Sequence, residues 1–477
     1  MCGIAGLMTR GGAADPPRLD RMAAALAHRG PDGEGRHLAG TVGLAQVRLS
    51  IVDLAGGRQP ILDPHGNAIV ANGEIYNDLD LRAGLADVAF ATGSDCEPPL
   101  HLYARHGLAF VEHLSGMYAL AIHDRARDRL VLARDPFGIK PLYLAEGAWG
   151  VAFASEAQAL RRAGFVAPGC DPRARAELLQ LQFTCGADTI FPGVRRLLPG
   201  ECVVVEGGRV VARHVRPALP AGPFPRLGLA AARRRLDDLL TRAVDRHQRA
   251  DVPFGMFLSG GIDSATLLAL MARLNPRGVL AFTAHFPGSA APDERERARA
   301  LAAAVGAQHV EVPFDVADFW ALLPAAAAAM DDPAADYAIL PTFKLAAEAR
   351  RAVKVILTGE GGDELFGGYG RYRARMRPWP FARRMRRAGP FDGLDVLRDG
   401  VLDGWRDRFA LAERDAAARP GWGRLRAAQA LDGADWLPHD LLAKADRCLM
   451  AHGVEGRVPF LDPDLAAFAF ALPDRMK

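Results

Sequence analysis

The first two hundred residues alternate short apolar runs with turns rich in glycine, proline and aspartate. This spacing predicts many short strands, because apolar runs of four to eight residues between turn residues are typical of buried strands. We expect strands at residues 42–47, 68–71, 117–123, 130–133, 151–154 and 202–205. Only residues 18–27 and 98–106 have a helical pattern. The first half is therefore predicted to be a strand-rich α+β layer structure.

A stretch rich in proline and glycine, residues 216–225, then interrupts the pattern and is the best linker in the chain. Beyond it, apolar positions recur at helical spacing at Leu236, Leu239, Leu240, Ala243 and Val244. Strand-like runs at residues 254–258, 279–284, 309–312 and 353–358 alternate with helical segments, and the alanine run 325–329 adds a plain helix. Alternating strands and helices predict an α/β domain with a doubly wound parallel sheet. Such sheets bind ligands beyond the carboxyl ends of their strands.

The composition limits the number of domains, the partners and the cellular compartment that we expect. A chain of 477 residues implies two to three domains. The formal net charge of +3 gives no bulk attraction to nucleic acid or membranes, so neither partner is expected. The six cysteines are scattered without a Cys-x-x-Cys pair, which favours neither a zinc site nor a disulfide framework. Without a secretory signal pattern or an apolar run of about 18 residues, the protein is predicted to be cytoplasmic.

One segment of the chain has a high local positive charge. Residues 371–387 contain eight arginines and no acidic residue, with Tyr372 and Trp379 among them. We interpret the segment as a basic face over a pyrophosphate exit or as a solvated helix. RNA binding is the alternative function for such a segment.

The chain begins with Met1-Cys2-Gly3-Ile4. A small second side chain allows the initiator methionine to be removed, which leaves a thiol and a free α-amine on Cys2. The amine, with an unperturbed pKa of about 8, can take up the thiol proton near neutral pH. Cys2 is therefore predicted to be a nucleophile that needs no distant histidine.

The second half carries a candidate phosphate-binding loop. Residues 259–264 read Ser-Gly-Gly-Ile-Asp-Ser, directly after a predicted strand and before a predicted helix. Glycine N–H groups, two serine hydroxyls and a helix N-terminus can together bind phosphate. Asp263 would repel phosphate unless it held Mg²⁺. The absence of Gly-Lys-Ser/Thr argues against γ-phosphate transfer, and a glycine turn that caps a core helix is the alternative.

A second glycine-rich loop follows another predicted strand. Residues 357–369 read Leu-Thr-Gly-Glu-Gly-Gly-Asp-Glu-Leu-Phe-Gly-Gly-Tyr. Clustered carboxylates repel one another unless a metal or a cationic substrate offsets their charge. Asp363 and Asp263 are therefore predicted to bracket a magnesium pyrophosphate, and Glu360 to orient or deprotonate an amine. The alternative is a solvated acidic loop.

Several motifs occur together and in order. The residues 1–4, 28–32 (His-Arg-Gly-Pro-Asp), 48–53 (Arg-Leu-Ser-Ile-Val-Asp), 72–77 (Asn-Gly-Glu-Ile-Tyr-Asn), 93–97 (Gly-Ser-Asp-Cys-Glu) and 134–143 resemble class II glutamine amidotransferases. With the two loops above and residues 453–462, the whole chain resembles glutamine-hydrolysing asparagine synthetases of the bacterial type. The resemblance implies an αββα N-terminal nucleophile sandwich at 2–215, a linker at 216–228 and an α/β ATP-pyrophosphatase domain at 229–477.

The resemblance also implies roles in the first half. Cys2 would be the nucleophile, and Asn72 with the Gly73 backbone N–H would form the oxyanion hole. Arg48 would bind the α-carboxylate of glutamine, since arginine fits a carboxylate with two parallel donors, and Asp95 would bind the α-amine. Further glutamine contacts are implied at Leu49, Ser50, Ile51, Val52 and Glu74.

In the second half, the resemblance implies ATP contacts at Leu258, Ser259, Gly260, Gly261, Asp263, Ser264, Ala284, Thr358 and Gly359. Asp263 and Asp363 would hold Mg²⁺. Glu360 matches the residue tied to formation of the acyl-adenylate. Lys444 and Arg447 are both candidates to neutralise the departing pyrophosphate.

The predicted reaction is the synthesis of asparagine from aspartate, glutamine and ATP through aspartyl-AMP, with a homodimer as the assembly considered. Tyr337, Ile339 and Leu340 are more apolar than this family's aspartate site would suggest. An amidotransferase that acts on another carboxylate therefore stays an alternative, and a non-catalytic regulatory scaffold is the alternative of another class. Relatives usually continue beyond Lys477, so a C-terminal helical tail is expected to be lacking.

Overall fold

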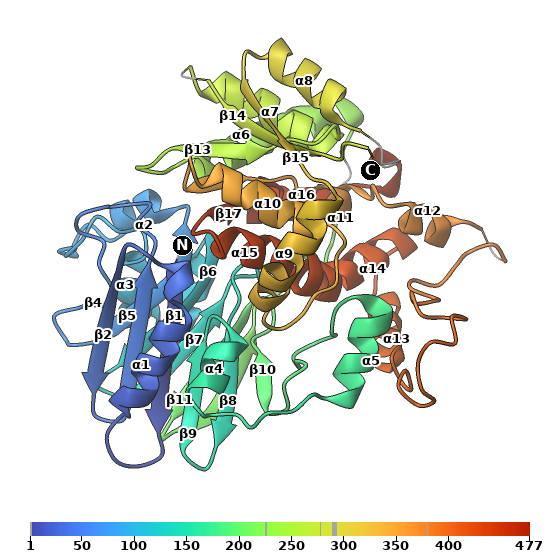
Figure 1. The fold of residues 1–477 in the computed structure, drawn as a ribbon. Coiled ribbons are helices and arrows are strands. Elements are labelled where there is room, and N and C mark those ends of the chain that lie inside the picture. Colours follow the sequence, from blue (N-terminus) through green and yellow to red (C-terminus); the bar gives the residue numbers. More distant parts are fainter. Residues whose placement is uncertain (1, 225–226, 277, 289–292, 379) are drawn as a thin grey trace.

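The computed structural model describes residues 2–224, 227–276, 278–288, 293–378 and 380–477. Its first half contains two six-stranded antiparallel sheets (Figure 1). The first sheet has the order β10-β8-β9-β1-β3-β2. Its strands are β1 (Cys2–Thr9), β2 (Gly33–Ala39), β3 (Val42–Arg48), β8 (Tyr143–Gly147), β9 (Gly150–Ala154) and β10 (Val194–Arg196).

The second sheet has the order β12-β11-β7-β6-β5-β4. Its strands are β4 (Ile61–Leu62), β5 (Ala68–Ile75), β6 (Gly116–Asp124), β7 (Arg129–Arg134), β11 (Glu201–Glu206) and β12 (Arg209–Val215). An apolar layer fills the space between the sheets, with Ile4 and Phe153 from the first and Val70 and Leu132 from the second. All six strands predicted for this half are present in β3, β5, β6, β7, β9 and β11.

Helices cover the outer face of each sheet and complete the αββα layers. The helices α1 (Pro16–Ala25) and α4 (Ala157–Arg162) pack on the first sheet. The helix α3 (Pro98–His106) packs on the second. The sandwich fold expected from the sequence is therefore confirmed.

The expectation of only two helices in this half was wrong. Besides α4, the structure has α2 (Asp78–Gly84) and α5 (Pro172–Leu181). The helices α2 and α4, of seven and six residues, contain too few turns for a clear apolar period. The start of α5 did carry a local signal, because the Asp171 carboxylate accepts a hydrogen bond from the backbone of Ala174 and Pro172 follows it.

The second half contains a five-stranded parallel sheet of order β15-β14-β13-β16-β17. Its strands are β13 (Phe254–Phe257), β14 (Leu280–His285), β15 (Gln308–Pro313), β16 (Val355–Leu357) and β17 (Glu455–Arg457). The predicted doubly wound sheet is confirmed, but β17 was not foreseen. It is three residues long, and two of them carry charges although both are fully buried.

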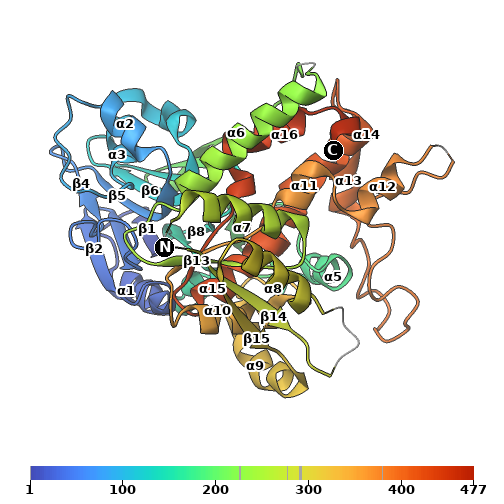
Figure 2. The same cartoon turned by 90° about the horizontal axis from the view of Figure 1, so that it is seen from above.

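Helices cover both faces of the parallel sheet (Figure 2). One face carries α6 (Leu229–His247), α7 (Ile262–Leu274), α8 (Arg295–Ala304) and α16 (Pro463–Ala471). The other carries α10 (Ile339–Ala349) and α15 (Leu442–Met450). In Figure 1, α15 lies between the parallel sheet and the sandwich.

The remaining helices are α9 (Val316–Ala329), α11 (Gly362–Phe366), α12 (Gly370–Met376), α13 (Asp407–Ala417) and α14 (Arg424–Leu431), with a π-helical segment at Asp432–Leu441. The alanine run lies in α9, as predicted. In the described ranges, no helix combines the length and the apolarity that a membrane span requires.

Candidate active sites

The first candidate site is built around Cys2, the first residue of β1. Its backbone N–H donates to Oδ1 of Asn72 at 3.1 Å, and Arg48 lies opposite it in the register of β1 and β3. Burial raises the pKa of the Cys2 thiol, and the backbone of Leu49 and the charge of Arg48 offset only part of this increase. The thiol therefore needs a base to become a nucleophile.

Two donors lie beside this thiol on β5. Asn72 is fully buried, and among the described residues its Nδ2 atom has no hydrogen-bond partner. Gly73 has a φ of 154°, and a Cβ at this position would collide with the carbonyl oxygen of Met117. Only glycine therefore fits here. A buried amide with a free donor next to a nucleophile is suited to binding a developing oxyanion.

The two charged residues expected to hold glutamine are both held by backbone groups. The Arg48 guanidinium donates to the backbone carbonyls of Leu54, Val52 and Asp53 at 3.1, 3.3 and 2.6 Å. Asp95 is buried and accepts the backbone N–H of Ile75 at 2.7 Å. Burial raises the pKa of Asp95, so a cationic partner would favour its charged form.

The other expected glutamine contacts divide into two groups. Leu49 and Ile51 are buried in the apolar core that the two halves share, and Val52 packs against it. The backbone N–H of Ser50 donates to Asp32 at 2.8 Å. Burial and the charge of Asp95 raise the pKa of Glu74 well above its usual range.

The second candidate site is a cavity of about 440 Å³ beyond the carboxyl ends of β13, β14 and β16. Nearly all of the residues expected to bind ATP and Mg²⁺ line it: Leu258, Ser259, Gly261, Asp263, Ser264, Ala284, Thr358, Gly359 and Asp363. Gly260 does not line it, but its N–H donates at 3.1 Å to the carboxylate of Glu294, which does. Both glycine-rich loops thus border one cavity, as their positions after parallel strands predict.

The first loop holds its donors in a fixed arrangement. The hydroxyls of Ser259 and Ser264 lie 2.9 Å apart, and the N–H of Gly261 donates to the Ser259 hydroxyl at 3.1 Å. The loop leads into α7, whose first turn faces the cavity. A phosphate group could therefore replace hydrogen bonds that the loop now makes with itself.

Asp263 and Asp363 fit the role of cation ligands. Burial and the charge of Asp363 raise the pKa of Asp263 to about 6, and burial raises the pKa of Asp363. The second loop wraps closely around both carboxylates. A Cβ at Gly362 would come within 2.6 Å of the Asp263 carboxyl carbon, and one at Gly368 would collide with Asp363. Two carboxylates are enough for Mg²⁺ that also binds substrate phosphates.

Glu360 lines this cavity and Lys444 interacts with it, whereas Arg447 lies elsewhere. Glu360 lines the cavity, and its Oε2 atom is buried without a hydrogen-bond partner in the described part of the chain. Although burial opposes a charge on Lys444, Glu360 and Asp336 raise the pKa of its ammonium. Arg447 instead pairs with Glu156 of the sandwich at 2.8 Å. Of the two expected cations, only Lys444 is near the candidate adenylation site.

The apolar stretch before α10 contributes less to the cavity than its sequence suggests. Tyr337 is 91% exposed, and Leu340 packs into a separate core cluster. Ala338, Pro341 and Thr342 line the cavity instead.

The arginine-rich segment is bound to the rest of the protein only in part. The Arg371 guanidinium pairs with Asp432 at 2.8 Å and lies 3.8 Å from the ring centre of Tyr369. Arg386 is stacked over Phe183 at 4.9 Å. Arg371 and Arg386 therefore make structural contacts, whereas five other arginines of the segment are exposed and leave a solvated basic face, namely Arg373, Arg377, Arg383, Arg384 and Arg387. Trp379 lies outside the described residues.

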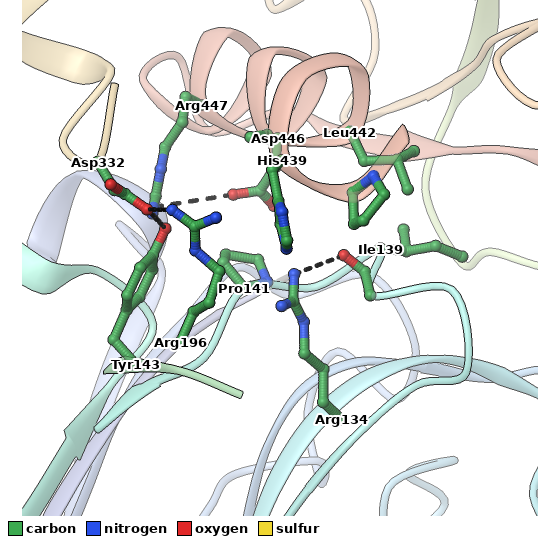
Figure 3. Close-up of a pocket in the computed structure, with 13 residues that line it drawn as sticks. Arg134, Ile139, Pro141, Tyr143, Arg196, Asp332, His439, Leu442, Asp446 and Arg447 are labelled. Atoms are coloured by element: carbon green, nitrogen blue, oxygen red, sulfur yellow. Dashed lines mark hydrogen bonds and ion pairs between the residues drawn. The ribbon is translucent and has the colours of Figure 1, made fainter. Parts of the chain in front are cut away.

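Sequence reasoning missed a group of buried charges where the two halves meet. Arg447, Asp446, Arg196, Asp332 and Tyr143 converge there around an enclosed cavity of about 20 Å³ (Figure 3). Such a volume is enough for about one water molecule. No local pattern could have revealed these pairs, because their members come from distant parts of the chain.

Comparisons with known proteins agree with this architecture. The family described as "Glutamine amidotransferase domain" matches residues 1–215, and "Asparagine synthase" matches residues 235–477. A Mycobacterium bovis protein whose name includes the words "asparagine synthetase [glutamine-hydrolyzing]" is 36% identical over 99% of this chain and 82% of its own length. Asparagine synthetase [glutamine-hydrolyzing] 1 of Bacillus subtilis is 31% identical over 100% of this chain and 82% of its own. Amidase chry2 of Gibberella zeae is 28% identical over 100% and 83%. This chain therefore belongs to the glutamine-hydrolysing asparagine synthetase family.

Proposed function

We propose that this protein makes asparagine from aspartate, glutamine and ATP, and releases glutamate, AMP and pyrophosphate. The observation that carries the proposal is the acidic ATP cavity, where Asp263, Glu360 and Asp363 converge in one chain with the Cys2 site. Acidic side chains can hold Mg²⁺ and can face the α-ammonium group of an amino acid.

At the first site, the Cys2 thiolate attacks the side-chain carboxamide carbon of glutamine. The thiol proton passes to the α-amine that removal of Met1 would free. Asn72 Nδ2 and the Gly73 N–H donate to the oxygen as it gains negative charge. The carbon–nitrogen bond then breaks, ammonia leaves with a proton from the amine, and water hydrolyses the thioester to glutamate.

At the second site, a carboxylate oxygen of the acceptor attacks the α-phosphorus of ATP, and pyrophosphate leaves. Mg²⁺ held by Asp263 and Asp363 would supply positive charge against the phosphates. Ammonia then attacks the acyl carbon of the adenylate, and AMP leaves. Glu360 is placed to take the proton that the new amide loses, and its charge raises the pKa of the Lys444 ammonium.

Between the sites, an apolar core offers a path for ammonia. Leu49, Met117 and Ile139 from the sandwich pack in one cluster with Leu258 and Leu442 from the second half. Apolar walls favour neutral ammonia over ammonium, because desolvation disfavours the charged form. Enclosed transfer would thus keep ammonia reactive.

A different carboxylate acceptor is the second candidate. The cavity also has apolar walls, with Phe257, Phe282 and Phe286 lining it, and a free amino acid has two charged groups that must each find a partner when desolvated. We favour aspartate because the apolar residues Tyr337 and Leu340 do not line the cavity.

The deciding experiment is amino-acid analysis after incubation with aspartate, glutamine, ATP and Mg²⁺. We expect asparagine and AMP in equal amounts, and glutamate in at least the same amount. Pyrophosphate release only with another carboxylate would favour the second candidate. A protein that releases neither glutamate nor AMP would instead fit a regulatory scaffold.

A further inference from the structure

Another large cavity lies along the helix α13, apart from the ATP cavity. Its volume is about 590 Å³, and in the described ranges the two cavities share no lining residue. Its charged lining residues are Arg375, Arg384, Arg406, Asp407, Glu413 and Arg414. Four arginines against two carboxylates leave a net positive charge. We refer to this site as the arginine cavity, and Figure 1 shows its elements in orange at the edge of the second half.

The sequence around α13 leaves room for this cavity. Its lining residues 406, 410, 413, 414 and 417 follow at intervals of three or four, so they lie along one face of the helix. Ala410 and Ala417 on that face have small side chains, which leave space above the helix. The volume falls in the range of roughly 300–1,000 Å³ that is typical of sites for small molecules.

Glu413 holds two of the arginines in place. Its carboxylate lies 2.8 Å from Arg406 and 3.8 Å from Arg375, and it accepts the backbone N–H of Met385 at 3.1 Å. The Arg406 guanidinium also donates to the backbone carbonyls of Met385 and Arg386, at 2.7 and 3.0 Å. The arginine-rich segment is thereby fixed against α13. Two guanidinium groups are therefore positioned before any ligand binds, which lowers the entropy that binding would cost.

The other two arginines are free to bind a ligand. Within the described part of the chain, the side chains of Arg384 and Arg414 make no hydrogen bond or ion pair, and both residues are exposed. A guanidinium offers two parallel N–H donors to phosphate oxygens and stays charged at physiological pH. Two fixed and two free guanidinium groups around one cavity fit an anion with two linked phosphate groups better than a single phosphate.

We propose that the arginine cavity binds a diphosphate anion, either inorganic pyrophosphate or the diphosphate group of a nucleotide. This site is separate from the proposed function, because neither Cys2 nor the ATP cavity takes part in it. We favour a small anion over RNA because the four arginines surround one cavity and do not follow an extended strip.

The two cavities should differ in their need for a metal. Asp263, Glu360 and Asp363 line the ATP cavity, and their charges repel pyrophosphate unless Mg²⁺ lies between them. The arginine cavity has the opposite charge and should bind pyrophosphate without a metal. Binding in the presence of EDTA therefore reports on the arginine cavity alone.

The test is isothermal titration of the full chain with pyrophosphate in EDTA. We expect one site per chain, with an affinity that falls as salt is added. The double variant Arg384→Ala/Arg414→Ala should lower the affinity by at least about tenfold, the effect of one lost hydrogen bond to a charged group. Arg387→Ala is the matched control, since Arg387 is exposed in the same segment but does not line the cavity. It should change the affinity by less than about twofold, because salt screens a charge that does not touch the ligand.

Other ligands identify what the cavity recognises. Phosphate should bind more weakly than pyrophosphate, because it can contact fewer of the arginines. ADP separates the two sources of a diphosphate: binding tighter than that of pyrophosphate would identify a nucleotide, and weaker binding would identify the free anion. Tight binding of an oligouridylate by a protein that does not bind pyrophosphate would overturn the inference in favour of RNA.

Hydrogen exchange on the wild type needs no variant. Pyrophosphate in EDTA should slow amide exchange in α13, residues 407–417, and leave the loop 259–264 unchanged. Protection of that loop alone would place the anion in the ATP cavity and contradict the inference.

Three results of the titration would also overturn the inference: no binding of pyrophosphate in EDTA, an unchanged affinity in the double variant, or an equal loss in Arg387→Ala. The last result would indicate a diffuse attraction to the basic segment. A chain that makes no asparagine but binds pyrophosphate in EDTA would contradict the proposed function and support the arginine cavity, so the two failures are distinguishable.

Discussion

Replacement of Asn72 by alanine tests the proposed oxyanion hole directly. The Asn72 amide is fully buried, and its Oδ1 atom is fixed by the Cys2 N–H at 3.1 Å. Its Nδ2 donor has no partner among the described residues. A buried donor without a partner lowers the free energy of unfolding by about 1–3 kcal/mol. Such a cost is explained if a ligand oxygen accepts this bond during the reaction.

The expected loss can be estimated from the two contacts removed. One oxyanion donor contributes about 2.7–4 kcal/mol to the transition state, which corresponds to a 10²–10³-fold decrease in kcat. The variant also loses the hydrogen bond to the Cys2 N–H. If this loss misplaces the nucleophile, it adds about 0.5–1.5 kcal/mol to the activation free energy. KM for glutamine should change little, since the neutral carboxamide oxygen needs this donor less than the oxyanion does.

The assay is glutamate release under saturating glutamine, with pyrophosphate release from added ammonium salts measured in parallel. The ammonium-dependent rate should stay at the wild-type level. Asn77→Ala is the matched control, because both atoms of that amide bind backbone groups, of His113 and Ser115, each at 2.9 Å. If Asn72→Ala kept kcat within tenfold of the wild type, or lost both activities together, the oxyanion role would be wrong.

Three further predictions follow from the two sites. Cys2→Ala should abolish glutamine hydrolysis and preserve ammonium-supported synthesis. The intact mass of the wild-type protein should show that Met1 is removed, and a retained Met1 would contradict the role of the amine. Asp263→Asn or Asp363→Asn should stop acceptor-dependent pyrophosphate release and spare basal glutamine hydrolysis, so an unchanged release at saturating Mg²⁺ would refute the metal role. Because the pKa of Asp263 is raised to about 6, protonated Asp263 stabilises the folded protein relative to the unfolded chain. This contribution to the free energy of unfolding is lost as the pH rises through that value. Asp263→Asn should therefore raise the Tm of the magnesium-free protein more at about pH 7 than at about pH 5, and an equal gain at both would contradict the raised pKa.

The sequence predicted strands where burial makes them uniformly apolar. All nine residues of β6 (Gly116–Asp124) are buried, and the apolar run in this strand predicts it. The strand β1 is almost as buried, but its two glycines and its position at the chain start obscured it. The strand β17 was missed for the opposite reason, since Glu455 and Arg457 satisfy each other inside the protein at 2.5 Å. Hydropathy cannot detect a buried charge whose partner is also buried.

The candidate sites were predictable because their residues occur as short contiguous motifs at the ends of strands. The contacts between the halves were not, as the Arg29–Asp446 pair joins residues 417 positions apart. Spacing could not distinguish Lys444 from Arg447 either. The two lie three residues apart on one helix, which normally places side chains on a common face.

The charge pattern of α15 explains why these neighbours diverge. Eight of its nine residues are buried, among them Lys444, Asp446 and Arg447. A surface helix would expose such charges, and a core helix would lack them. A helix enclosed between two domains must instead pair each charge with whichever domain its side chain reaches. Lys444 reaches Asp336 in the second half, whereas Asp446 and Arg447 reach the sandwich. Three charges on a helix without a solvent-exposed face thus indicate an element that packs between two domains and pairs with both.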